Sequence, residues 1–276
     1  MMDDVLSPTN RDDDKEREFA PLDILLVDDS VVIQKLLASL LENHNIETAG
    51  DGKAAVTIMK KERFDIVLMD VQMPEMDGFE ATAAIRKTEE GHRTPIIAMT
   101  ASAATDDRDQ CLAAGMDGYI GKPIQPDDLR RTIEQFTQSH SHSTSASSAD
   151  ESFSSPGIGA SSDVIDLEMA RRQIPGGEQG VREMAQFLLD QCPTMMMEIQ
   201  QALTARDGKR IQRAAHSLKG STDIFGAKHV VGVARRIELA GKRGNVNDAS
   251  EAMPELREQV SQLRSALAVT AAAEPH

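Results

Sequence analysis

A run of four apolar residues that ends in a carboxylate constrains the fold of this chain more than any other stretch. Residues 66–69 are Ile-Val-Leu-Met, Asp70 follows them, and a segment with Pro74 and Gly78 comes next. An uninterrupted apolar run between polar boundaries predicts a strand that is buried on both faces, as in a parallel sheet. Ligands bind such sheets at the carboxyl ends of the strands, so Asp70 belongs either to a functional site or to a turn that it caps.

Strand and helix patterns alternate over the first 138 residues. The predicted strands are 23–27, 46–49, 65–70, 95–99 and 118–120, and the predicted helices are 31–42, 53–62, 79–87, 106–113 and 126–138. Five strand–helix units predict an α/β domain with a five-stranded parallel sheet that helices cover on both faces. We expect this domain to span residues 21–138, after a disordered acidic leader of residues 1–20.

The composition changes abruptly after residue 138. Residues 139–162 contain eleven serines, which predicts a flexible linker. Beyond the linker no strand pattern occurs, and helical patterns cover 166–173, 181–205, 207–224, 227–240 and 247–267. These patterns predict an all-α four-helix bundle over residues 163–268, followed by a disordered tail of residues 269–276.

The charge balance and the two cysteines narrow the classes of partner. With 30 basic and 45 acidic residues the net charge is −15, which argues against nucleic acid or an anionic membrane as a partner. Cys111 and Cys192 are far apart and form no CxxC motif, so neither a disulfide framework nor a zinc site is indicated. We find no signal-peptide pattern and no run of 18 apolar residues. We therefore expect a cytoplasmic protein that binds other proteins or a divalent cation.

Polar side chains stand where the strands of the α/β half end. Asp28 and Asp29 follow the first strand, and Asp70 ends the third. If these strands are neighbours, three carboxylates converge, and their mutual repulsion makes sense around a hard cation such as Mg²⁺. Thr100 and Lys122 follow two later strands, and a hydroxyl and an ammonium at the same edge could contact a phosphoryl group.

These residues lie in motifs that resemble the receiver domain of two-component response regulators over residues 21–138. In chain order the motifs are Val-Asp-Asp-Ser at 27–30, Met-Asp-Val-Gln-Met-Pro-Glu-Met-Asp-Gly at 69–78, Ala-Met-Thr-Ala at 98–101, Ala-Gly-Met-Asp-Gly-Tyr at 114–119 and Lys-Pro at 122–123. Together they are highly specific, although each fragment alone is weak. The resemblance implies the flavodoxin-like fold of receivers.

The resemblance also implies roles for single residues. Asp70 would accept a phosphoryl group from a phosphohistidine donor such as a sensor histidine kinase, and Lys122 and Thr100 would bind the phosphoryl oxygens. Thr100 would then move toward the phosphate while Tyr119 turns inward. A cis peptide bond before Pro123 would aim Lys122.

The resemblance further implies Mg²⁺ held by Asp28, Asp29, Asp70 and the main-chain carbonyl of Gln72. A carboxylate beside such a metal can take a phosphoryl group as a mixed anhydride, so aspartyl phosphorylation would be self-catalysed. An enzyme alternative is an aspartyl-phosphate hydrolase of the haloacid dehalogenase class. Those enzymes place a second Asp as acid or base at the position where this chain has Gln72.

The helix predicted at 207–224 carries the candidate residue of the second half. Its buried face is predicted from helical spacing to consist of Ile211, Ala215, Leu218, Thr222 and Phe225. His216 is therefore expected on an exposed side, with a neutral imidazole available at pH 7. Lys219 beside it could meet phosphate, and Gly220, costly in a helix, suggests that another surface approaches closely there.

The motif Ala-His-Ser-Leu-Lys-Gly-Ser at 215–221, followed by Phe-Gly-Ala at 225–227, resembles the histidine phosphotransfer (Hpt) domain over residues 163–268. The resemblance implies that His216 is the phosphohistidine. The chain would then be a phosphorelay protein in which Asp70 is loaded and His216 exchanges the group with a receiver, here or on a downstream partner. Neither glycine-rich ATP-binding boxes nor a DNA-binding pattern occurs, so we expect no ATP-dependent kinase domain. The alternative is a phosphorylation-controlled docking module or phosphate sink in which His216 does not serve Asp70.

Overall fold

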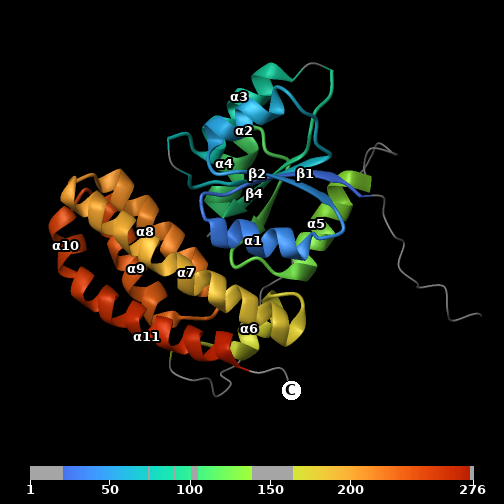
Figure 1. Ribbon diagram of the computed structural model, residues 1–276. Coiled ribbons are helices and arrows are strands. Elements are labelled where there is room, and N and C mark those ends of the chain that lie inside the picture. Colours follow the sequence, from blue (N-terminus) through green and yellow to red (C-terminus); the bar gives the residue numbers. More distant parts are fainter. Residues whose placement is uncertain (1–20, 74, 90, 101–104, 139–163, 274–276) are drawn as a thin grey trace, which may run out of the picture.

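The computed structural model describes residues 21–73, 75–89, 91–100, 105–138 and 164–273, with the side chains of 105–108 left out. The leader, the serine-rich linker and residues 274–276 of the tail lie outside the described residues. The described residues form an α/β domain and a helical bundle that lie against each other, with helix α1 facing the bundle (Figure 1).

The α/β domain alternates strands and helices in the predicted order. Its strands are β1 (Asp23–Val27), β2 (Asn45–Ala49), β3 (Ile66–Asp70), β4 (Ile96–Thr100) and β5 (Gly118–Gly121). Its helices are α1 (Val31–Leu40), α2 (Gly52–Met59), α3 (Gly78–Thr88), α4 (Thr105–Ala114) and α5 (Pro126–Gln138). All pairings are parallel and the strand order is β2-β1-β3-β4-β5, which confirms the predicted five-stranded parallel sheet.

Successive side chains of the central strands pack on opposite faces of the sheet. The face toward α1 and α5 buries Ile24, Leu26, Ile66, Leu68, Ile97 and Met99. The face toward α2, α3 and α4 buries Leu25, Val27, Val67, Met69, Ile96 and Ala98. Because helices cover both faces, no position in these strands favours a polar residue, which explains the uninterrupted apolar runs of the sequence.

Side-chain caps fix where the helices next to the sheet edge begin. Ser30 is the N-cap of α1, and its hydroxyl accepts a hydrogen bond from the Ile33 amide at 3.3 Å. Helix α3 begins with a capping box, in which Asp77 and Glu80 each accept a hydrogen bond from the other's amide. These caps fix the ends of the loops that leave β1 and β3.

The second half contains helices only among its described residues. They are α6 (Leu167–Gln173), α7 (Gly177–Thr204), α8 (Gly208–Asp223), α9 (Lys228–Lys242), α10 (Val246–Glu251) and α11 (Met253–Ala272). The face of α8 that was predicted to be buried is fully buried in the bundle core. None of the helices described is both long and apolar enough to cross a membrane.

The last helices differ from the sequence prediction in two respects. The helix expected at 247–267 is divided at Ala252, because Pro254 stands in the first turn of α11, where its missing amide costs no hydrogen bond. Helix α11 also continues to Ala272, so the first four residues of the predicted disordered tail are helical. Two of these four residues, Ala271 and Ala272, are strong helix formers.

Gly78 offers a test of how tightly the end of β3 is packed. A Cβ added at Gly78 would lie 2.3 Å from the Asp70 carbonyl oxygen and 3.0 Å from the Val71 Cα, so backbone would have to move. We expect Gly78→Ala to lower the free energy of unfolding by about 1–3 kcal/mol, as overpacked sites do, in urea titrations. Gly50→Ala is the control, because its Cβ would meet nothing within 4 Å. Equal losses in the two variants would contradict this packing.

Candidate functional site

The sheet brings three predicted carboxylates together at one edge. Asp28 follows β1 and Asp70 ends β3, and these two strands are paired neighbours. Oxygens of Asp28, Asp29 and Asp70 all lie within 4.8 Å of one another. Asp28 and Asp70 are buried and Asp29 is half-buried. The arrangement is the one expected when neighbouring parallel strands both end in acids.

Lys122 reaches into this cluster from the segment after β5. Its Nζ lies 2.9 Å from Asp28 Oδ2, to which it donates a hydrogen bond, and 3.0 Å from Asp70 Oδ2. Burial lowers the pKa of Lys122, but the charges of Asp28 and Asp70 outweigh burial and hold this pKa above its ordinary value. Lys122 is therefore an ammonium at neutral pH. The peptide bond between Lys122 and Pro123 is cis, as the resemblance implied.

One ammonium does not compensate three carboxylates. Burial raises the pKa of Asp28, and the charge of Asp70 raises it further. The Lys122 ammonium lowers the pKa of Asp28 but does not outweigh these two effects, so this pKa stays above its ordinary value. Burial and the charges of Asp28 and Asp70 raise the pKa of Asp29 well above its ordinary value. The site therefore holds more negative charge than its own residues stabilise.

One oxygen of the cluster also has no hydrogen-bond donor. Asp70 Oδ1 accepts a hydrogen bond from the Gln72 amide at 3.2 Å. Asp70 Oδ2 is buried, lies 3.0 Å from the Lys122 ammonium, and has no well-aligned hydrogen-bond donor among the described residues. A buried, undonated carboxylate oxygen beside two further acids is the hard-oxygen donor set that fits a divalent cation of the Mg²⁺ type.

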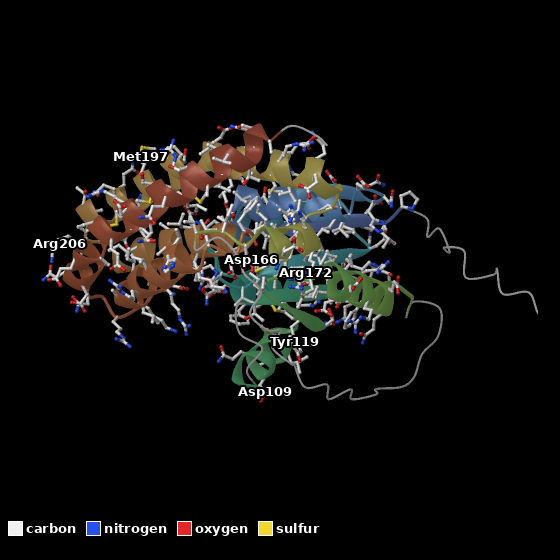
Figure 2. The ribbon with its side chains drawn as sticks, turned by 90° about the horizontal axis from the view of Figure 1, so that it is seen from below. Asp109, Tyr119, Asp166, Arg172, Met197 and Arg206 are labelled. Carbon is white, nitrogen blue, oxygen red and sulfur yellow. The ribbon has the colours of Figure 1, made fainter. Side chains whose placement is uncertain are left out.

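Thr100 and Tyr119 lie on the two strands next to the cluster. Thr100 is buried at the end of β4, and its carbonyl accepts the Lys122 amide hydrogen bond at 2.7 Å. Tyr119 on β5 is 38% exposed and lies with Asp109 on the part of the α/β domain away from Met197 and Arg206 of the bundle (Figure 2). The coupled movement of Thr100 and Tyr119 stays a prediction.

His216 is buried, so the prediction of an exposed imidazole was wrong. Only 5% of the residue is exposed. Helical periodicity identified the face of α8 that packs into the bundle core, but not what covers its other side. On that side Glu238 from α9 covers the ring, with its Oε1 2.7 Å from His216 Nδ1.

Glu238, which sequence reasoning missed, determines the orientation of the His216 ring. Burial raises the pKa of Glu238, but hydrogen bonds from His216 and Lys219 outweigh burial and hold this pKa below its ordinary value. The carboxylate is therefore ionised at neutral pH and can only accept, so a neutral His216 carries its proton on Nδ1 and leaves the Nε2 lone pair free. The sequence does contain a sign of this role, because Glu238 is an acidic residue on the apolar face of α9, between Ala234 and Gly241.

The two predicted neighbours of His216 behave differently. Lys219 donates a hydrogen bond to Glu238 Oε2 at 2.7 Å, and its Nζ lies 3.3 Å from His216 Nδ1. A Cβ added at Gly220 would meet nothing within 4 Å, so the close approach expected at Gly220 is not found. The next residue, Ser221, contacts the α/β domain instead, through a 2.8 Å hydrogen bond with Ser30.

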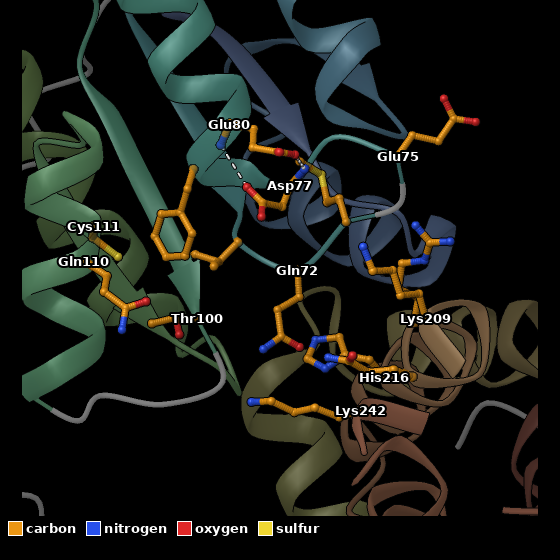
Figure 3. Close-up of a pocket in the computed structure, with 15 residues that line it drawn as sticks. Gln72, Glu75, Asp77, Glu80, Thr100, Gln110, Cys111, Lys209, His216 and Lys242 are labelled. Atoms are coloured by element: carbon orange, nitrogen blue, oxygen red, sulfur yellow. Dashed lines mark hydrogen bonds between the residues drawn. The ribbon is translucent and has the colours of Figure 1, made fainter. Parts of the chain in front are cut away.

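A cavity of about 510 Å³ is lined by residues of both halves. Gln72 and Thr100 line it from the α/β domain, and His216 and Lys242 line it from the bundle (Figure 3). Figure 3 shows the Gln72 side chain, which leaves the loop directly after Asp70, pointing toward His216. The cavity therefore joins His216 to two predicted residues of the receiver site, whereas the carboxylates of the acidic cluster do not line it.

Family comparisons agree with this division of the chain. The family model of the response regulator receiver domain matches residues 24–134, and the Hpt domain model matches residues 183–266. The chain is a receiver domain followed by an Hpt domain. The receiver match lies in the α/β half and the Hpt match in the bundle.

The relatives of this receiver–Hpt protein are larger. It is 29% identical over 257 residues to the signal transduction histidine-protein kinase BarA of Escherichia coli and 31% identical over 245 residues to the sensor histidine kinase GacS of Pseudomonas protegens. Each match covers 87% of this chain, which spans only 26% of the length of either relative.

The receiver also resembles a solved structure. The receiver domain of a sensor histidine kinase from Pseudomonas aeruginosa, described with a magnesium ion in its active-site cleft, is 39% identical to it with a TM-score of 0.41. The match covers 43% of this chain and 99% of that chain.

The Glu238 contacts of the Hpt domain predict a specific pH dependence of stability. A carboxylate whose pKa is lower in the folded state than in the unfolded state stabilises the fold above the unfolded value of about 4.5, and this stabilisation is lost as pH falls through the folded value. We expect Glu238→Gln to be less stable than wild type at pH 7 and the difference to shrink below pH 4.5 in urea titrations.

Glu255→Gln is the matched control, because Glu255 pairs with Arg236 at the surface, where solvent screens the charge. We expect this variant to differ little from wild type at either pH. If the free energies of unfolding of Glu238→Gln and wild type differ by the same amount at pH 7 and below pH 4.5, the role of Glu238 as an ionised partner of His216 is contradicted.

Proposed function

We propose that Asp70 accepts a phosphoryl group from a phosphohistidine donor and that His216 exchanges this group with a receiver aspartate. The observation that carries the proposal is that His216 lines one cavity together with Gln72 and Thr100, which stand beside Asp70 on the chain and on the neighbouring strand. The matching region of sensor histidine kinases supports such a kinase as the donor. A downstream receiver domain is the expected second partner.

In the loading step, an Asp70 oxygen attacks the phosphorus of the donor phosphohistidine. The bond from phosphorus to the donor nitrogen breaks and an acyl phosphate forms on Asp70, with the electron pair returning to the donor imidazole. Negative charge accumulates on the phosphoryl oxygens, where Lys122 supplies the nearest ammonium and the Thr100 hydroxyl a hydrogen-bond donor. The buried position of both side chains keeps competing water away from them.

In the exchange step, the Nε2 lone pair of His216 attacks the phosphorus of an aspartyl phosphate. The bond from phosphorus to the Asp oxygen breaks, the carboxylate leaves, and a bond from phosphorus to Nε2 forms. The Nδ1 proton remains in the hydrogen bond with Glu238, whose negative charge stabilises the positive charge that develops on the ring. The reverse step uses the same groups.

The acidic cluster fits Mg²⁺ as the cofactor of the receiver site. Asp28, Asp29, Asp70 and the main-chain carbonyl of Gln72 would hold the ion, which supplies positive charge for the developing phosphoryl oxygens. The undonated Asp70 oxygen and the raised pKa values of Asp28 and Asp29 support this assignment.

A phosphoryl-loading experiment tests the proposed pair of residues. We expect wild type, incubated with Mg²⁺ and radiolabelled acetyl phosphate, to carry base-labile label on Asp70 and base-stable, acid-labile label on His216. Asp70→Ala should lose both labels and His216→Ala only the base-stable label. Asp65→Ala and His229→Ala are matched controls, because Asp65 lies at the other end of β3 and His229 is exposed on α9.

Base-stable, acid-labile label that persists in His216→Ala would contradict the assignment of the histidine. Base-labile label that persists in Asp70→Ala would contradict the assignment of the aspartate. Wild type that carries label on Asp70 only would favour the alternative function, in which the protein is a docking module or phosphate sink and His216 does not exchange.

The magnesium assignment has its own test by isothermal titration calorimetry. We expect one saturable Mg²⁺ site per chain and weaker binding in Asp29→Asn, by at least the roughly tenfold that residues orienting a metal ligand contribute. Without Mg²⁺, Asp29→Asn should be more stable than wild type at neutral pH, because it removes a charge that the folded cluster disfavours. Asp51→Asn, which keeps the α2 cap, is the control. Unchanged affinity in Asp29→Asn would exclude this ligand set.

A further inference from the structure

Helices α7 and α11 form a groove on the outer side of the bundle, here called the α7–α11 groove. It consists of two hollows, of about 320 Å³ and about 560 Å³, which are lined by residues of these helices and share Pro193, Ser261 and Arg264. Met197 lines it and is 53% exposed, on a part of the bundle away from the labelled residues of the α/β domain (Figure 2). No residue of the groove lines the cavity of His216. The proposed phosphoryl chemistry therefore does not use this surface.

Methionines make the surface of the groove apolar and adaptable. Met196 and Met197 on α7 line it together with Met253 and Val260 on α11. The unbranched thioether side chains of methionine adapt their shape, so methionine-rich surfaces accept apolar side chains of different form. An apolar groove that is open to water favours an occupant that covers it.

Two arginines give the same groove a positive charge. Arg257 and Arg264 line it and stand two helical turns apart on α11. Arg257 donates a hydrogen bond to the side-chain oxygen of Gln200, and no ion pair is recorded for either arginine within the described residues. Asp190 is the single acid among the described residues that line the groove. In a chain with a net charge of −15, this surface is suited to an acidic occupant.

The acidic leader of residues 1–20 has the chemistry that such a groove fits. It begins Met-Met-Asp-Asp-Val-Leu, so that the aliphatic Val5 and Leu6 directly follow the acids Asp3 and Asp4. Aliphatic side chains suit the methionine surface, and carboxylates suit arginines. The other acidic run of the leader, residues 12–14, is flanked by basic residues and has no apolar neighbour, so it matches the groove in charge only.

The leader is also long enough to reach the groove. From Leu6 to Pro21, where the described residues begin, the chain advances fifteen residues, which span about 50 Å when extended. Helix α7, with 28 residues, is shorter, at about 42 Å. A tether of this kind keeps a segment at a roughly millimolar concentration around its site, so modest affinity is sufficient for docking.

We propose that residues 3–6 of the leader bind the α7–α11 groove of the same chain. Val5 and Leu6 cover the methionines, and Asp3 and Asp4 pair with the two arginines of α11. Because the leader continues into β1 of the receiver, its docking adds a second connection between the receiver and the Hpt domain, besides the serine-rich linker.

Oxidation of Met197 tests the docking on the full-length chain. The protein is treated with hydrogen peroxide, and methionine sulfoxide at Met197 is followed by peptide mass spectrometry, with the half-buried Met59 at the end of α2 as internal control. A docked leader shields Met197. We therefore expect the double variant Asp3→Lys/Asp4→Lys to be oxidised at Met197 at least about threefold faster than wild type, with Met59 unchanged.

Two further leader variants separate the apolar contribution from charge alone. Val5→Ser/Leu6→Ser keeps the charge and should also speed oxidation of Met197. Asp12→Lys/Asp13→Lys is the matched control, because it changes the charge of the leader as much as Asp3→Lys/Asp4→Lys does but lies outside the proposed segment. We expect this control to be oxidised at the wild-type rate.

Charge reversal in the groove tests the partner of the acids. Arg264→Glu should speed oxidation of Met197 as the leader variants do. Arg235→Glu is the matched control, because Arg235 is exposed on α9 and has no recorded ion pair within the described residues. Combining Arg264→Glu with Asp3→Lys/Asp4→Lys should restore the protection, which a purely structural effect of Arg264→Glu would not allow.

Each outcome supports or overturns the docking. Equal oxidation of Met197 in wild type and in the Asp3→Lys/Asp4→Lys chain overturns it. An effect of Asp12→Lys/Asp13→Lys as large as that of Asp3→Lys/Asp4→Lys overturns the choice of segment. Protection that increases between about 1 and about 100 μM protein, far below the effective concentration of a tether, shows that the leader of a second copy is the occupant and overturns docking within one chain. The measurement includes no phosphoryl transfer, so failure of the docking leaves the proposed function standing.

Discussion

The ion pair that Lys122 makes with Asp28 and Asp70 is the interaction on which the rest of the receiver depends. It joins the ends of β1, β3 and β5, so it forms only if all intervening strands have the observed order and register. One ammonium among three acids leaves an excess of negative charge, which burial makes costly. The same excess of negative charge favours a divalent cation at this edge of the sheet, as proposed above.

The Hpt site also combines a carboxylate with a lysine, but there the carboxylate is not the proposed nucleophile. In the receiver the proposed nucleophile is the carboxylate of Asp70, and Lys122 stabilises charge on it. In the Hpt domain the carboxylate of Glu238 orients the proposed nucleophile, His216, and Lys219 holds that carboxylate ionised. The proposed exchange therefore pairs an anionic oxygen of the receiver with a neutral nitrogen of the Hpt domain.

The sequence predicted the features that follow from local patterns. Continuous apolar runs identified the strands, and because parallel strands end at one edge, Asp70 and Lys122 were expected to lie together although they are far apart in the chain. Glu238 was missed because it lies 22 residues from His216 on another helix, and only the packing of α8 on α9 brings it there. Ser221 was missed as a contact because its bond to the Ser217 carbonyl makes it look like any helical serine. The burial of His216 likewise depends on how whole elements pack.

The most direct test of this account is ³¹P NMR of the chain with ¹⁵N-labelled histidine, recorded after loading with acetyl phosphate and Mg²⁺. The account predicts that an aspartyl phosphate resonance declines while a nitrogen-bound phosphate grows, and that this phosphorus couples to the Nε2 of His216, since Glu238 occupies Nδ1. Coupling to Nδ1, or an aspartyl phosphate that decays to inorganic phosphate without any nitrogen-bound signal, would contradict it.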